Sequence, residues 1–256
     1  MRLIKARVQG YRSVIDSGWF DVETGKTILV GPNEAGKTAI LQALQKLNPP
    51  DGIELFDPLR DYPRAKYDED IEKGGVDPST HTVVEGHFFL EDTDKEKVPN
   101  AYKDAIYVFG RHLDNSTWHD LSNVPAQLTF SEVEKDFLKM IAHFQDMAFK
   151  ENVTQDLIDA IQTEYETMIS GIDRSSIITV DQAKQLHSWL KRNIKYLDDN
   201  NSKENARYEK IESQIERPEV HAKVLASCKE LLPKFILFSN YFRIKPVLHL
   251  RKLADR

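Results

Sequence analysis

One run of eight residues constrains this chain more than any other feature of its sequence. From Gly31 to Thr38 the chain carries Gly-Pro-Asn-Glu-Ala-Gly-Lys-Thr, which matches the pattern G-x-x-x-x-G-K-[ST] at every fixed position. This motif needs a strand before it and a helix after it. An apolar run at residues 26–30 and a helical pattern at residues 37–47 supply both. We therefore predict a phosphate-binding loop between a strand and a helix.

The residue types of this loop suit a nucleoside triphosphate. Consecutive backbone N–H groups can surround a phosphate, and Gly31 and Gly36 permit the backbone angles and close approach that a Cβ would block. The helix N-terminus adds its dipole. Lys37 is a point charge that can reach the β- and γ-phosphates, and the Thr38 hydroxyl is a hard oxygen ligand for Mg²⁺. The predicted cofactors are ATP and Mg²⁺; the alternative is a glycine-rich turn that binds no ligand.

The predicted binding set includes one residue outside the loop. Arg12 follows the first predicted strand, where it either folds back toward the nucleotide or remains an ordinary surface arginine. Thr38 is the predicted metal ligand. The predicted cofactor-binding residues are Arg12, Gly31, Pro32, Asn33, Glu34, Ala35, Gly36, Lys37, Thr38 and Ala39.

No catalytic residue is identified. Hydrolysis needs an apolar strand that ends in Asp, often followed by Glu, which holds Mg²⁺ and positions water. Residues 88–92 are the nearest match, but their Glu-Asp pair is better interpreted as a solvated strand end, and residues 235–238 are followed by Ser-Asn. No Leu-Ser-Gly-Gly element occurs, and residues 169–172 are better interpreted as a helix C-terminus. We predict ATP binding with little hydrolysis by this chain alone.

Hydropathy patterns predict an α/β fold whose first part is rich in strands. Period-two alternation and short apolar runs indicate strands. The helix at residues 37–47 is expected to carry Ile40, Leu41, Leu44 and Leu47 on one apolar face, and the Asn-Pro-Pro that follows ends it. Residues 57–80 lack periodicity and are predicted to be a long mobile loop. The predicted strands are residues 3–8, 19–22, 26–30, 83–90, 105–109 and 116–119, the last three forming a meander.

The pattern changes to helical spacing near Ser131, which is expected to form a capping box with Glu134. Amphipathic helices follow, and the last of them is expected to break at Pro218. Their apolar stripes can be buried only against each other or against a second copy. The predicted domains are an ATP-binding lobe (1–130), a helical arm or insertion (131–232) and a return strand to the core (233–256), with the strand at 235–238.

Composition narrows the function classes further. The chain has 256 residues and a net charge of −6, so the whole chain is not a generic polyanion binder. Its single cysteine, Cys228, excludes an internal disulfide framework and a multi-cysteine metal site, and its apolar position in a helical pattern predicts an inert buried thiol. No apolar run approaches the roughly 20 residues that span a bilayer. We expect a cytoplasmic protein without a membrane partner.

Several segments resemble the head domains of the SMC, RecF and OLD group of ABC-type ATPases. The similar segments are residues 3–14 (LIKARVQGYRSV), 28–38 (ILVGPNEAGKT) and 41–44 (LQAL). In this group an I-x-N-[FY]-R-S segment ends the first strand, and an asparagine between the loop glycines, here Asn33, separates the group from GTPases and most kinases. Residues 232–241 resemble the re-entry strand after the helical insertion of OLD-like ATPases. Gln9-Gly10 departs from the usual Lys-Asn before the aromatic residue.

The resemblance implies a P-loop NTPase of ABC-head type, with a mixed sheet, N-terminal antiparallel strands and a helical insertion. It implies a homodimer or higher oligomer in which two heads sandwich two ATP molecules, and a role in gating DNA processing, such as bacterial anti-phage defence. DNA and a nuclease or effector subunit or domain are the implied partners. The family's signature motif, Asp-Glu element and switch histidine follow the helical arm. The chain is therefore expected to be the N-terminal part of a longer protein, or else a short chain that has lost hydrolysis.

Two other functions stay open. A small-molecule or nucleotide kinase would use the acidic segment at residues 57–80 as a lid, although Asn33 and the strands before the loop argue against it. A non-hydrolysing ATP-sensing scaffold would bind ATP through the same loop.

Overall fold

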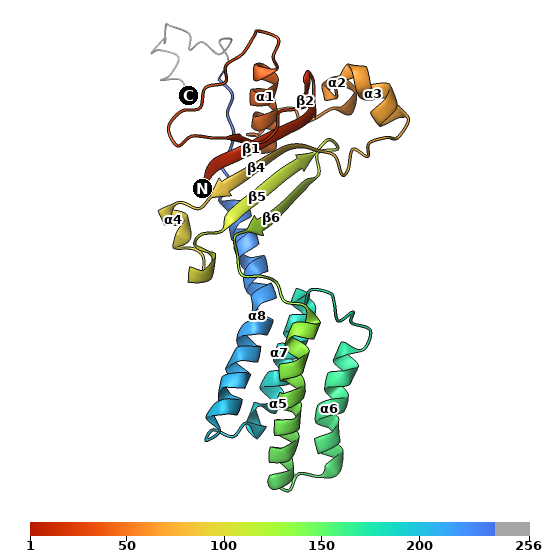
Figure 1. The fold of residues 1–256 in the computed structure, drawn as a ribbon, viewed down its shortest axis with the longest axis vertical. Coiled ribbons are helices and arrows are strands. Elements are labelled where there is room, and N and C mark those ends of the chain that lie inside the picture. Colours follow the sequence, from red (N-terminus) through yellow and green to blue (C-terminus); the bar gives the residue numbers. More distant parts are fainter. Residues whose placement is uncertain (239–256) are drawn as a thin grey trace, which may run out of the picture. The chain divides into compact units, whose positions relative to one another are not determined.

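The chain divides into two compact units in the computed structural model, which describes residues 1–238. Unit 1 comprises Met1–Asn123 together with the described residues from Lys229 onward, and unit 2 comprises Val124–Cys228 (Figure 1). The sequence predicts boundaries after residues 130 and 232, so both structural boundaries lie a few residues earlier. The chain is mixed α/β, with an antiparallel sheet in unit 1 and helices that make up unit 2.

The sheet of unit 1 has six strands, and every pairing in it is antiparallel. The strand order is β2-β1-β4-β5-β6. Strand β3 also pairs with β1, at Lys5 and Ala6, whereas β2 pairs with β1 nearer its C-terminal end, at Gln9 and Tyr11. Alternation explains β1, because Ala6 and Val8 are fully buried while Arg7 between them is only partly covered. The predicted meander is confirmed as β4, β5 and β6. The strands are β1 (Arg2–Tyr11), β2 (Val14–Asp16), β3 (Phe20–Asp21), β4 (Thr82–Phe89), β5 (Ile106–His112) and β6 (Thr117–Ser122).

Helix α1 (Lys37–Leu47) has the bounds that the sequence predicts, and its buried residues are Ala39, Ala43, Lys46 and Leu47. Ala39 and Ala43 are buried, whereas Leu41, which lies on the predicted apolar face, is 44% exposed. At the end of the helix, Leu47 lies over Gly86 of β4, where an added Cβ would be 3.1 Å from Leu47 Cδ2. A glycine in β4 therefore leaves room for the Leu47 side chain at this contact.

Two predicted strands are wrong. Residues 26–30 and 235–238 have no regular secondary structure. Phe235 instead donates its backbone N–H to the carbonyl oxygen of Asn48 (3.0 Å). An apolar run becomes a strand only where a neighbouring strand accepts its backbone hydrogen bonds, and within residues 1–238 neither segment has such a neighbour. Four apolar side chains of these segments are consequently more than half exposed: Ile28, Val30, Ile236 and Phe238.

The predicted mobile loop at residues 57–80 is also wrong, because short helices occupy this segment. Asp57 caps the first of them by accepting hydrogen bonds from two backbone N–H groups. The side chain of Asp61 then anchors the segment, since it is fully buried in unit 1. The short helices of unit 1 are α2 (Pro58–Asp61), α3 (Arg64–Tyr67), η1 (Asp68–Glu72), α4 (Asp92–Lys95) and η2 (Asn100–Tyr102).

Unit 2 is a group of helices with its own hydrophobic core. Four aromatic residues form the centre of this core. The indole of Trp189 lies 6.0 Å from the ring of Phe137, 6.1 Å from that of Phe144 and 5.6 Å from that of Tyr165, measured between centroids. The apolar stripes of the helices are thus buried against one another. The helices are α5 (Phe130–Lys150), α6 (Gln155–Ile169), α7 (Val180–Asn193), η3 (Ile194–Tyr196) and α8 (Ser202–Glu230).

The start of α5 differs from the prediction. Its capping box is formed by Thr129 and Glu132 rather than by Ser131 and Glu134. Thr129 forms an isolated antiparallel bridge with Ile177, which holds it in extended backbone and lets the helix begin directly after it. Among residues 1–238, no helix combines the length and the apolar character that a membrane-spanning segment requires.

Helix α8 continues through Pro218, where the sequence predicts a break. A proline within a helix removes one backbone hydrogen bond and strains the preceding turn. Pro218 is itself buried and follows Ile211 and Ile215 at intervals of four and three residues, so it lies on the buried face. Burial of that face offsets the missing hydrogen bond, and the helix does not end.

Candidate phosphate-binding loop

The side chain of Lys37, the first residue of α1, turns back over the predicted loop. Its Nζ atom donates to the carbonyl oxygens of Gly31 (2.6 Å) and Pro32 (2.5 Å). The loop is further closed by a hydrogen bond from the Ala35 backbone N–H to the Pro32 carbonyl oxygen (3.2 Å). The motif's full positive charge is therefore held among the backbone groups of the loop.

Gly36 is required at its position for two separate reasons. It is the N-cap of α1 with φ 80°, a left-handed conformation that side chains disfavour. A Cβ at this position would also lie 2.8 Å from Val14 Cγ2 and 3.3 Å from Ser13 Oγ. The turn between β1 and β2 thus packs directly against the loop, and a glycine is needed where they meet.

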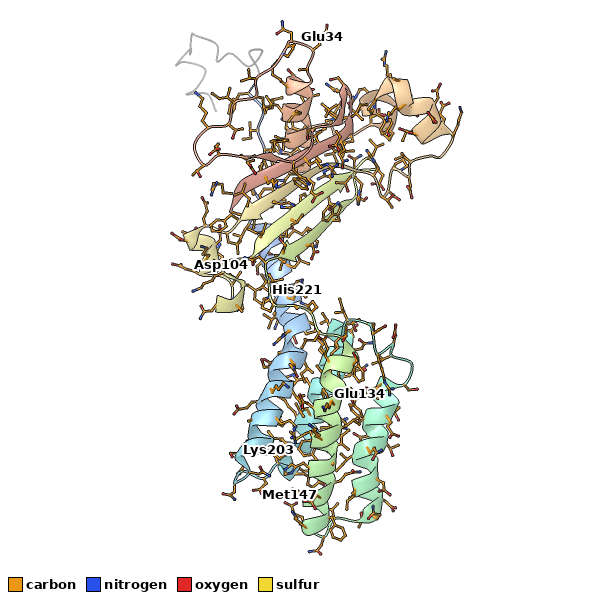
Figure 2. All side chains as sticks on the ribbon, in the orientation of Figure 1. Glu34, Asp104, Glu134, Met147, Lys203 and His221 are labelled. Atoms are coloured by element: carbon orange, nitrogen blue, oxygen red, sulfur yellow. The ribbon has the colours of Figure 1, made fainter. Side chains whose placement is uncertain are left out.

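The remaining loop residues leave the helix N-terminus accessible. The first N–H groups of an α-helix have no intrahelical partner and carry a partial positive charge. Thr38 is exposed, so its hydroxyl is free to coordinate a cation, whereas Ala39 is buried against the core. Pro32, Asn33 and Glu34 are exposed in the loop, and Figure 2 marks Glu34 there. The donor set of Lys37, Thr38 and the helix end suits a magnesium triphosphate, although residues 26–30 do not form the strand that the motif is expected to follow.

Arg12 lies beside α1 and is fixed to a buried carboxylate. It has φ 54°, and its backbone N–H donates to the carbonyl oxygen of Asp61 (2.6 Å). Its Nε and Nη2 atoms donate to Asp61 Oδ1, both at 3.2 Å, and Nη1 donates to Gln42 Oε1 at 2.5 Å. The contacts of Arg12 are thus with α2 and α1 rather than with residues 31–38, while its side chain remains 40% exposed.

Asp61 is the centre of a charge cluster in unit 1. Lys46 of α1, almost fully buried, donates to Asp61 Oδ2 at 2.7 Å, and Arg60 approaches the same oxygen at 3.5 Å. Burial by itself raises the pKa of the Asp61 carboxyl, but the Lys46 hydrogen bond, a backbone N–H from Asp57 and the cationic charges outweigh burial. The pKa of Asp61 therefore lies below its ordinary value.

Two cavities border these groups. One of about 390 Å³ adjoins the loop at Ala35, and much of its lining is apolar, including Val14, Phe20, Leu29 and Ile40. The other, of about 350 Å³, is polar and is lined by Arg12 among others. Both fall in the usual size range of small-ligand sites, about 300–1,000 Å³. An apolar cavity next to a phosphate-binding loop suits a planar base.

The nearest carboxylate candidate for hydrolysis lies at the wrong end of the sheet. Arg2 of β1 pairs with Phe89 of β4, so the residues after β4 lie beside the start of β1. The loop packs against Val14, beyond the opposite end of β1. Since β1 has ten residues, the two ends are about 30 Å apart. Glu91 instead forms a capping box with Asp94 at the start of α4, which confirms its interpretation as a strand end.

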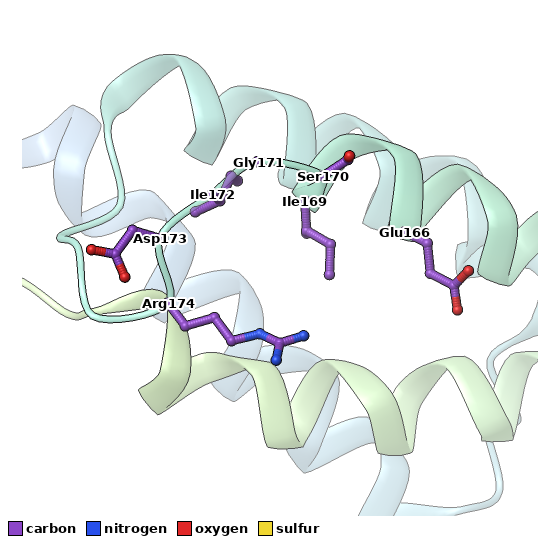
Figure 3. A pocket seen from close by; sticks show the side chains of 7 residues that line it. All are labelled: Glu166, Ile169, Ser170, Gly171, Ile172, Asp173 and Arg174. Atoms are coloured by element: carbon purple, nitrogen blue, oxygen red, sulfur yellow. The ribbon is translucent and has the colours of Figure 1, made fainter.

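A larger cavity, of about 700 Å³, lies in unit 2 and holds none of the predicted site residues. The segment after α6 lines it, from Ile169 to Arg174 (Figure 3). Helix α6 ends at Ile169, and Gly171 takes φ 84°. The interpretation of residues 169–172 as a helix C-terminus is confirmed. Arg174 is engaged with Glu134 at 3.0 Å.

Sequence reasoning missed Asp61 and Lys46, which hold Arg12 and α1 together. The sequence contains a signal for the segment that carries Asp61, because Asp57 followed by Pro58 is a favourable helix start and predicts a helix there. It contains none that separates Lys46 from the other lysines. Comparisons with protein-family models and with curated proteins find no match for this chain.

Proposed function

We propose that this chain binds a nucleoside triphosphate, ATP with Mg²⁺, through residues 31–38, as the ATP-binding lobe of a P-loop ATPase of ABC-head type. The observation that carries this function is the joint placement of Gly36 and Lys37. A left-handed glycine starts a helix of eleven residues, and the lysine ammonium already occupies the loop by binding two carbonyl oxygens. A triphosphate would take over those lysine contacts while the helix end supplies further donors.

Unit 1 offers a candidate partner for each part of the proposed ligand. The β- and γ-phosphates would bind the loop N–H groups and Lys37, and Mg²⁺ would bind the Thr38 hydroxyl. The base would enter the apolar cavity beside Ala35. Arg12 is partly exposed, so its guanidinium could release Gln42 and bind a phosphate while its backbone stays anchored to Asp61.

The resemblance to the OLD, SMC and RecF group extends the proposal to a biological role. In this role two copies, or a higher oligomer, close on ATP and gate DNA processing in anti-phage defence, together with a nuclease or effector subunit or domain. The solvent-exposed loop supports this, since a second copy could cover the bound ATP. The exposed apolar side chains of Ile28 and Val30, directly before the loop, are also available for burial in such an assembly.

Titration of a fluorescent ATP analogue in the presence of Mg²⁺ tests the proposed ligand. Lys37→Ala is expected to abolish binding, because the phosphate charge then lacks its compensating cation. Lys26→Ala is the matched control: it makes the same change of charge at an exposed lysine outside the loop, and it should bind as the parent does. Equal affinity in Lys37→Ala and Lys26→Ala would rule out this loop as the nucleotide site.

A further inference from the structure

Three potential metal ligands converge on the surface of unit 2, on two different helices. His187 lies on α7, and Glu212 and Glu216 lie one turn apart on α8, which places both on the same side of that helix. The His187 Nε2 atom is 3.4 Å from Glu212 Oε1 and 4.0 Å from Glu216 Oε1. One ligand atom from each residue lies within 4.8 Å of the others.

The charge of this group is not balanced by a basic side chain. Some carboxylates of unit 2 pair with lysine or arginine, such as Asp136 with Lys210 at 2.6 Å and Glu219 with Lys223 at 2.7 Å. Among the residues that the structure describes, neither Glu212 nor Glu216 has such an ion pair. Two carboxylates one turn apart repel each other, and a single imidazolium would offset only one of them. A divalent cation bound by a neutral imidazole would offset both.

We propose that His187, Glu212 and Glu216 form a binding site for one divalent transition-metal ion of the Zn²⁺ class. In tetrahedral coordination with bonds of about 2.0–2.2 Å, neighbouring ligand atoms are about 3.4 Å apart. The contact between His187 and Glu212 already has this length, whereas the Glu216 carboxylate must move closer, because it lies 4.0 Å from His187 and the separations within the group are bounded at 4.8 Å. The imidazole ligand favours Zn²⁺ over Mg²⁺, which prefers oxygen ligands.

The ion would clamp α7 to α8 in an exchangeable site. The exposed side-chain fractions are 24% for His187, 31% for Glu212 and 51% for Glu216, so water can fill the fourth position. A metal that binds only the folded unit stabilises it in proportion to its concentration and affinity. Zn²⁺ should therefore raise the melting temperature of the protein.

The test is a calorimetric titration of the full, tag-free chain with Zn²⁺ alone, after removal of metals with a chelator. The parent should bind one Zn²⁺ per chain, and excess Mg²⁺ should not displace it. His187→Ala and Glu216→Gln should each weaken binding at least about tenfold, since even residues that only support metal ligands commonly account for 10–100-fold. Glu216→Gln changes an exposed, nearly isosteric side chain, so its effect does not depend on altered folding.

Matched variants complete the design. Glu209→Gln removes the same charge from an exposed position of α8 outside the group and should bind Zn²⁺ as the parent does. Lys37→Ala should also leave Zn²⁺ affinity unchanged, which keeps this result independent of nucleotide binding. Co²⁺ substitution should give the visible absorption of tetrahedral coordination, and His187→Ala should remove it. Unchanged Zn²⁺ affinity in both His187→Ala and Glu216→Gln, or no Zn²⁺ binding by the parent, would overturn the site.

Discussion

Replacement of Gly36 by alanine separates the two reasons why the loop needs a glycine. An alanine in left-handed backbone costs about 1–2 kcal/mol, partly offset by about 0.4–1 kcal/mol because the unfolded chain loses freedom. Gly52 has nearly the same φ, 82° against 80°, but its added Cβ would meet no atom within 4 Å. Gly52→Ala should therefore cost about 0–1.6 kcal/mol.

Gly36→Ala adds a contact of 2.8 Å with Val14 Cγ2. Overpacking of this kind costs typically about 1–3 kcal/mol, which brings the expected cost of Gly36→Ala to about 1–5 kcal/mol. Because the β1–β2 turn must move to accommodate the methyl group, the loop geometry changes as well. We expect ATP affinity to fall at least about tenfold, which corresponds to about 1.4 kcal/mol.

Urea unfolding and ATP-analogue titration measure the two effects. The double variant Val14→Ala/Gly36→Ala removes the clashing Cγ2 atom, so its cost should be smaller than the sum of the single costs by about 1–3 kcal/mol. A Gly36→Ala cost within about 0.5 kcal/mol of the Gly52→Ala cost, or strictly additive behaviour with Val14→Ala, would refute the contact between the β1–β2 turn and the loop.

Three further results are expected. Asp61→Asn should destabilise unit 1 by about 3–5 kcal/mol near neutral pH, because it leaves Lys46 buried without its carboxylate partner. The folded pKa of Asp61 is depressed, so its charge contributes stability above the unfolded pKa of about 3.9, and this contribution is lost as the pH falls through the lower folded pKa. The difference in unfolding free energy between parent and variant, measured in urea, should therefore shrink in acid, and a pH-independent difference would contradict this assignment. Phosphate-release assays should show only trace ATP turnover. A rate near the roughly 1–100 s⁻¹ typical of kinases would mean that the protein has a catalytic carboxylate that we have not identified. Replacing residues 124–228 by a short Gly/Ser linker should leave a soluble unit 1 that still binds ATP, with loss of self-association or DNA binding; an insoluble product would show that unit 1 depends on the helices.

The elements that local chemistry determines were predictable from the sequence. The bounds of α1 follow from Gly36 at its start and from the Asn-Pro-Pro after Leu47, which no helix continues through easily. Its buried face was only partly predictable from hydrophobicity, because Leu47 is buried as expected but Ala39 and Ala43 are buried while the larger Leu41 is exposed. Which face of a helix is buried depends on the elements that pack against it.

The errors arise where structure depends on distant partners. Residues 26–30 and 235–238 have the composition of strands, but composition does not supply the neighbouring backbone that a strand needs. The burial of Asp61 could not be predicted within an acidic segment, because it depends on ion pairs with Lys46 and Arg12, which are not its neighbours in sequence. For the same reason the loop could be found from its pattern, whereas the charge cluster that holds Arg12 beside α1 could not.

The aromatic centre of unit 2 also gives the protein a built-in optical reporter. Of the three tryptophans in the chain, Trp189 alone belongs to unit 2, where it is fully buried, while Trp19 and Trp118 belong to unit 1. A variant with phenylalanine at positions 19 and 118 would show tryptophan emission from the helical unit only, and one with phenylalanine at position 189 would show it from the sheet unit only. Intrinsic emission can thus follow the melting of each unit in the intact chain without any attached dye.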